Sequence, residues 1–147
     1  MRYDLELITQ RCREIGLSAL TEAGQRVDVD LGQGAILCFQ NADREEDCLI
    51  GFLGTPWHTH DDLIFADGRG NYVELDYLNL LTGVKEGRVL ICEREVAGRA
   101  VDRWLVHSEY NDEFKYLEEA LRITVHYGDS AFNSAISCRH QIECTVS

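Results

Sequence analysis

Residues 89–107 read VLICEREVAGRAVDRWLVH, and they decide the fold because they predict a β-hairpin. The predicted strands are Val89–Val96 and Val101–His107, which are rich in branched and aromatic residues. Between them lies a three-residue turn at 97–99, centred on a glycine. A hairpin of this length indicates an antiparallel sheet rather than a parallel sheet wound with crossover helices.

The charges on the two strands predict the register of the hairpin. With three residues in the turn, Arg94 faces Asp102 and Glu93 faces Arg103. A shift by one residue would set acidic side chains against each other, and opposed like charges destabilise a strand pair. We therefore expect the register that pairs opposite charges.

Hydrophobic periodicity predicts the remaining elements and the fold class. Four helices are expected: one over 5–15 that Asp4 caps and Gly16 ends, a short one from Ser18 to Gly24, a short one over 75–81 that Gly83 closes, and one that Asn111 caps, with Phe114, Leu117 and Leu121 on it. Besides the hairpin, strands are expected over 27–31, 35–39, 48–53, 63–65, 72–73 and 123–125, with an edge strand near 141–143. Together they predict an α+β fold, a mainly antiparallel sheet of about six strands with the N-terminal helix and short helices packed on one face. With 147 residues, we expect residues 1–147 to form a single globular domain.

Charge and composition narrow the partner class. The net charge of −12 opposes binding to nucleic acid and to anionic membranes, and it favours a basic protein partner, although solubility alone can also explain it.

No apolar run approaches the roughly 18 residues of a membrane span, and the start carries charges where a signal peptide is apolar. Cys38, Cys48 and Cys92 lie in or beside apolar runs, which indicates free buried thiols. These features predict a cytoplasmic protein.

The segment Trp57–Asp62 has a pattern typical of metal ligands. On an extended chain His58, His60 and Asp62 share one face, and two imidazoles with one carboxylate can hold a divalent metal. The metallo-β-lactamase pattern requires another histidine where residue 63 is leucine. A surface loop with hydrogen-bonded histidines explains the same residues, so no cofactor is expected except under this metal alternative.

A cysteine–histidine dyad is excluded by the expected register. His107 lies opposite Val89, which places it about 10 Å along the strand from Cys92. A dyad requires hydrogen-bond contact.

Acidic and aromatic residues alternate after the hairpin. The acidic residues are Glu109, Asp112, Glu113, Glu118 and Glu119, and the aromatic ones are Tyr110, Phe114 and Tyr116. A solvated helix face explains the charges, because acids in a first helical turn also complement the helix dipole. Aromatic anchors inside a charged rim are also typical of protein interfaces.

Three stretches resemble small bacterial proteins encoded beside polymorphic toxins. They are Gly54–Asp62, Glu86–Glu93 and Asp102–His107, within a similar region from about Gly54 to Tyr116. The resemblance implies an immunity protein, a single cytosolic α+β domain that binds and blocks a cognate toxin. No functional residue transfers with it.

The leading hypothesis is a non-catalytic binding protein that neutralises a basic, nuclease-like toxin. The expected partner-binding residues are Trp57, Asp61, Asp62, Glu109, Tyr110, Asp112, Glu113 and Phe114. Two alternatives stay open: a small metal-dependent hydrolase that uses His58, His60 and Asp62, and a scaffold subunit without separable activity.

Overall fold

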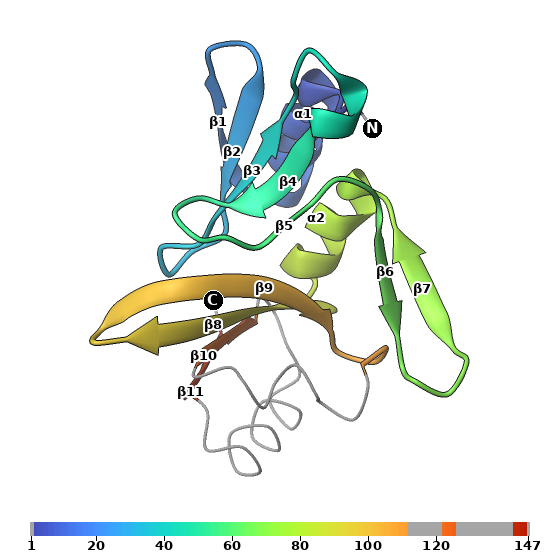
Figure 1. The fold of residues 1–147 in the computed structure, drawn as a ribbon, viewed down its shortest axis with the longest axis vertical. Coiled ribbons are helices and arrows are strands. Elements are labelled where there is room, and N and C mark those ends of the chain that lie inside the picture. The colour runs from blue at the N-terminus through green and yellow to red at the C-terminus, as the bar shows by residue number, and fades with distance from the viewer. Residues whose placement is uncertain (1, 112–121, 126–142, 147) are drawn as a thin grey trace. The chain divides into compact units, whose positions relative to one another are not determined.

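The chain forms two compact units in a computed structural model that describes residues 2–111, 122–125 and 143–146 (Figure 1). Unit 1 contains residues 1–63 and 75–82, and unit 2 contains residues 64–74 and 83–147. The α+β class and the mainly antiparallel pairing are confirmed. The expected single domain stays a prediction.

Unit 1 begins with helix α1, Leu5–Ile15, whose two ends are those predicted. The Asp4 carboxylate accepts a hydrogen bond from the Leu7 backbone N–H at 3.1 Å, which satisfies a donor of the first turn. Gly16 ends the helix in the left-handed region, with φ 79°. The apolar stripe of α1 is fully buried at Ile8 and Cys12.

A five-stranded antiparallel sheet follows α1 in the order β1-β2-β3-β4-β5. Its strands are β1 (Ser18–Glu22), β2 (Arg26–Asp30), β3 (Ile36–Gln40), β4 (Leu49–Phe52) and β5 (His58–Thr59), with a short 3-10 helix, η1 (Glu45–Asp47), before β4. The predicted helix over Ser18–Gly24 is wrong. Positive φ values at Ala23 and Gly24 turn the chain back, so that β1 pairs with β2.

Alternation along the strands of unit 1 separates a buried face from an outer face. Cross-strand partners of the buried face are Val27, Phe39 and Ile50, together with Val29, Leu37 and Phe52. The outer face includes Asp28, which is paired with Cys38. Tyr3 and Tyr77 add an aromatic cluster, with ring centroids 5.9 Å and 6.4 Å from Phe39.

A two-stranded hairpin and a second helix link the two sheets along the chain. The elements are β6 (Leu63–Ala66), β7 (Tyr72–Leu75) and α2 (Tyr77–Lys85). In the turn between the two strands, the Asp67 carboxylate accepts hydrogen bonds from the backbone N–H groups of Arg69 and Asn71. The prediction that Gly83 closes the helix is wrong. Gly87, with φ 78°, ends α2, because its N–H bonds Val84 O and the Arg88 N–H bonds Gly83 O.

Unit 2 contains a four-stranded sheet in the order β11-β10-β8-β9. Its strands are β8 (Val89–Val96), β9 (Arg99–His107), β10 (Arg122–Val125) and β11 (Glu143–Val146). Strand β10 confirms the strand predicted over 123–125, whereas the edge strand predicted near 141–143 is shifted to β11 and runs parallel to β10. The described strands thus form three sheets of five, four and two strands, and not one sheet of about six.

The register of the β8–β9 hairpin is the one that charge predicted. Glu93 pairs with Arg103 and Arg94 with Asp102. The three-residue turn is wrong: Ala97 and Gly98, with φ 53° and 77°, form a two-residue turn. A β-bulge between Arg94 and Glu95 compensates for the shorter turn. The pairs from Arg94–Asp102 to Val89–His107, on the side away from the turn, therefore keep the predicted register.

The helix expected after Asn111, with Phe114, Leu117 and Leu121, lies outside the described residues. Among the residues that are described, neither helix has the length and apolar character needed to cross a membrane.

Candidate functional site

The segment 54–62 of unit 1 contains half of the site residues that the sequence predicted: Trp57, His58, His60, Asp61 and Asp62. It follows β4, turns back, and pairs through β5 with β4, so that His58 lies opposite Gly51 at the edge of the sheet (Figure 1). Trp57, Asp61 and Asp62 lie on either side of this short strand. The sheet therefore fixes the centre of the segment.

A glycine allows the segment to approach the sheet closely. A Cβ atom at Gly51 would lie 3.0 Å from the backbone O of Trp57 and 3.1 Å from Cβ of His58. Contacts this short are tighter than nearly all real Cβ contacts, so a side chain here would require the segment to shift by a few tenths of an ångström. Glycine within a strand often marks such a close backbone approach.

Trp57 is half-buried, and its ring packs against Phe52 with centroids 5.8 Å apart at 40°. It forms one wall of a shallow groove of about 220 Å³ on the outer face of the sheet, together with Cys38, Gly51 and His58. An aromatic ring that is anchored on one side and exposed on the other is suited to contact a partner.

The thiol in this groove is not an activated nucleophile. Burial, and then a hydrogen bond to Asp28 and its charge, raise the pKa of Cys38 to about 12. Asp28 is itself paired with Arg26, at N···O distances of 2.9 Å and 3.1 Å. Because the thiolate is the reactive form, Cys38 is inert at neutral pH.

Tyr3 supports the segment from the buried side. Its hydroxyl lies 3.5 Å from the backbone O of His60, and only 3% of the residue is exposed. Burial, followed by the nearby Cys48, Asp61 and Asp62, raises the pKa of the Tyr3 phenol. The phenol therefore stays neutral and donates to the segment without adding charge.

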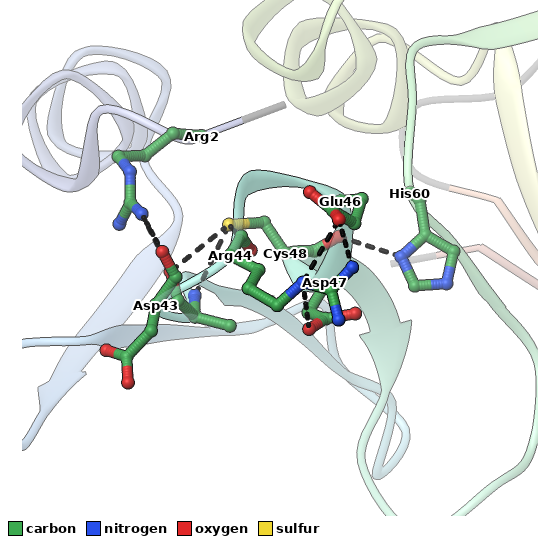
Figure 2. A network of polar contacts seen from close by, with 8 residues as sticks. Arg2, Asp43, Arg44, Glu46, Asp47, Cys48 and His60 are labelled. Carbon is green, nitrogen blue, oxygen red and sulfur yellow. Dashed lines mark hydrogen bonds and ion pairs between the residues drawn. The ribbon is translucent and has the colours of Figure 1, made fainter.

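A second acidic stretch lies beside the segment, as Figure 2 shows. The ring of His60 bonds through Nδ1 to the backbone O of Cys48, at 2.9 Å, directly after the acidic stretch 43–47. Arg44 pairs with Glu46 and Asp47 in the same stretch. A hydrogen bond from its own backbone, and then one from Arg44, lower the pKa of Glu46, which keeps this carboxylate charged.

Unit 1 carries most of the net charge of the chain. It contains thirteen carboxylates against five arginines, which leaves −8 of the total −12. Asp61 and Asp62 belong to the segment, and Asp43, Glu45, Glu46 and Asp47 directly precede Cys48, whose backbone O bonds to the His60 ring. Such an excess attracts cationic partners and repels nucleic acid.

His58 and His60 lie together, with ring centroids 5.1 Å apart. No group of three potential metal ligands forms within the described part of the chain. The structure therefore brings two of the predicted ligands together, and the three-ligand set with Asp62 stays a prediction.

The other predicted partner-binding residues belong to unit 2 or lie outside the described residues. Glu109 is exposed, and Tyr110 is half-buried with its ring 5.1 Å from that of His107. Asp112, Glu113 and Phe114 are not described. The expectation that these residues share one surface with Trp57 thus stays a prediction.

His107 anchors the turn that carries Glu109 and Tyr110. It lies opposite Val89, as the register predicted, and is 5% exposed. Its Nδ1 accepts hydrogen bonds from the backbone N–H groups of Glu109 and Tyr110, at 3.0 Å and 3.3 Å. An accepting Nδ1 carries no proton, so this turn requires the neutral ring.

We expect acid to destabilise the protein through His107. Burial lowers its pKa below 6.5; Glu109 opposes the shift and Arg88 adds to it. At pH values between the lowered pKa of the folded state and 6.5, the unfolded chain binds more protons than the folded chain. The contribution of neutral His107 to the free energy of unfolding is therefore complete above pH 6.5 and is lost as the pH falls. Urea unfolding should show a smaller pH slope for His107→Gln than for wild type between about pH 7 and 5.5. Equal slopes would contradict this role.

No protein-family model, curated protein or solved structure matches this chain.

Proposed function

We propose that this chain is a non-catalytic binding protein that captures a basic protein by stoichiometric association. The observation that carries the proposal is the placement of Trp57, anchored on Phe52, on the same segment as Asp61 and Asp62 in a unit of net charge −8. Fixed negative charge accelerates encounter with a cationic protein. An aromatic ring that becomes buried on binding then slows dissociation.

The partner class that fits this chemistry is a nuclease-like toxin, whose cleft must be basic to hold phosphates. The chain would act as an immunity-type protein, in line with the resemblance of its segments to such proteins. In that role it works in the cytoplasm and needs no cofactor, nucleic acid or membrane. Glu109, Tyr110, Asp112, Glu113 and Phe114 are proposed to extend the contact surface.

Charge reversal at Asp61 should slow capture. We expect Asp61→Lys to lower the association rate with a captured basic partner by about 10-fold at low ionic strength, and less at high salt, because exposed charges act mainly through screened steering. Trp57→Ala should instead mainly raise the dissociation rate. Surface plasmon resonance separates the two rates.

Glu14→Lys is the matched control, because it makes the same change in charge on the exposed side of α1. It should reduce the association rate much less than Asp61→Lys. Equal rates for the two variants would show that only net charge matters and that segment 54–62 is not the contact surface.

The metal-dependent hydrolase and the scaffold subunit remain alternative predictions. Turnover of phosphoesters by metal-loaded protein would support the first. Copurification with abundant cellular proteins, and with no toxin, would support the second.

A further inference from the structure

The pair His58 and His60 is held in a defined arrangement by the sheet. Strand β5 holds His58 by pairing with β4, and His60, in the bend directly after β5, is bonded through its ring to the backbone O of Cys48, the residue before β4. The two rings accordingly lie 5.1 Å apart, with their planes at 89°. Both side chains project from an exposed edge of unit 1.

Backbone carbonyls fix the tautomer of both rings. Nδ1 of His58 lies 3.0 Å from the O of Pro56, and Nδ1 of His60 lies 2.9 Å from the O of Cys48 (Figure 2 shows the second contact). A carbonyl oxygen only accepts hydrogen bonds, so each Nδ1 carries the proton. Each neutral ring therefore keeps its lone pair on Nε2, and a carbonyl partner of this kind typically orients a metal-ligating histidine.

We propose that His58 and His60 form a two-histidine site for a divalent transition-metal ion, through Nε2 of each ring. Two imidazoles on one tetrahedral ion, with metal–nitrogen distances of about 2.0–2.1 Å, place their ring centres about 5 Å apart. The observed separation of 5.1 Å matches this arrangement. The other coordination positions are left to water or to a ligand supplied by another molecule.

The donor type selects the class of ion. Imidazole nitrogen suits Cu²⁺, Ni²⁺ and Zn²⁺, whereas Mg²⁺ and Ca²⁺ prefer oxygen ligands. Among these ions, Cu²⁺ binds a given nitrogen site most tightly. The exposed carboxylate of Asp61 and the net charge of −8 on unit 1 further raise the local concentration of cations.

The test uses the isolated full chain without an affinity tag, and CuCl₂ as the probe. We expect calorimetry to detect a site that His58→Ala and His60→Ala each weaken by at least about 10-fold, since the loss of an outer-shell partner alone costs 10–100-fold. The double variant should lack this site. Electron paramagnetic resonance of wild type should show coupling to two imidazole nitrogens.

Thr59→Ala is the matched control, because it changes the residue between the histidines and keeps both rings. It should retain the wild-type affinity, while circular dichroism verifies that every variant is folded. Equal Cu²⁺ affinity in wild type and in the double variant would overturn the site and leave the rings as a packing pair. The inference is independent of the proposed capture function, because no partner enters the experiment.

Discussion

Replacing Glu93 with alanine is expected to destabilise the protein by about 3–5 kcal/mol, because it leaves a buried guanidinium without its counter-ion. Glu93 is only 5% exposed, and its Oε1 lies 3.0 Å from Nε and 2.8 Å from Nη2 of Arg103 on the paired strand. Removing one member of such a pair is costly even where the intact pair contributes little net stability. Urea unfolding followed by circular dichroism measures the loss.

Two variants separate this effect from general disturbance of the hairpin. Arg94→Ala changes the exposed neighbour that pairs with Asp102, and it should cost less than about 1 kcal/mol. Replacing Glu93 and Arg103 together by leucine and methionine should restore most of the stability, because neither member of the pair then leaves the other as an unpaired charge. If Glu93→Ala and Arg94→Ala lower the free energy of unfolding by the same small amount, loss of the buried Glu93–Arg103 pair is not the costly step proposed here.

Phe39→Ala should cost a similar amount, about 3–5 kcal/mol, through the cavity that it leaves in unit 1. Phe39 is fully buried, and its ring packs against Tyr3 and Tyr77. Since Tyr3 supports His60, the cavity should also loosen segment 54–62. Chemical unfolding gives the free energy, and the fluorescence of Trp57, measured with Trp104 replaced by phenylalanine, reports on the segment.

Leu20→Ala is the control for this second prediction. Leu20 is 62% exposed in the same sheet, so its truncation should change the free energy of unfolding by no more than about 0.5 kcal/mol. Phe39→Leu should fall between the two, because it removes less volume. A Phe39→Ala variant as stable as Leu20→Ala would contradict the aromatic core of unit 1.

The sequence predicted those parts of the fold that local patterns determine. Asp4 and Gly16 gave both ends of α1, because capping chemistry depends on single residues. Opposite charges gave the pairing of β8 with β9, because only one register avoids like-charge contacts. These signals require no knowledge of distant residues.

The predictions of local structure were wrong where pairing with another strand, or a residue later in the chain, determines the conformation. Residues 18–22 form a strand because β2 pairs with them, and their own sequence has no clear period. Helix α2 continues past Gly83 because Gly87 supplies the left-handed end and Val84 is fully buried. The hairpin turn has two residues because Ala97 adopts a positive φ, which is unusual for alanine.

The candidate site was only partly predictable. The sequence singled out Trp57, His58 and His60, but it did not show which residues support them: Tyr3, 57 residues from His60, and Cys48 and Gly51, directly before and within β4. No periodicity of the sequence reveals these contacts, because they depend on how the chain folds back on itself. The one available signal was a glycine inside an apolar strand, which indicates close backbone approach.

Binding of a cationic protein by segment 54–62 of the acidic unit 1 can be measured by affinity capture from native lysate with mass spectrometry. The baits are wild type, Glu14→Lys and the double variant Trp57→Ala/Asp61→Lys. We expect wild type and Glu14→Lys to retain the same basic protein, in a salt-sensitive manner, and the double variant to lose it. Retention of that protein by the double variant, or capture of no basic protein by wild type, would show that segment 54–62 is not a binding surface for a cationic protein.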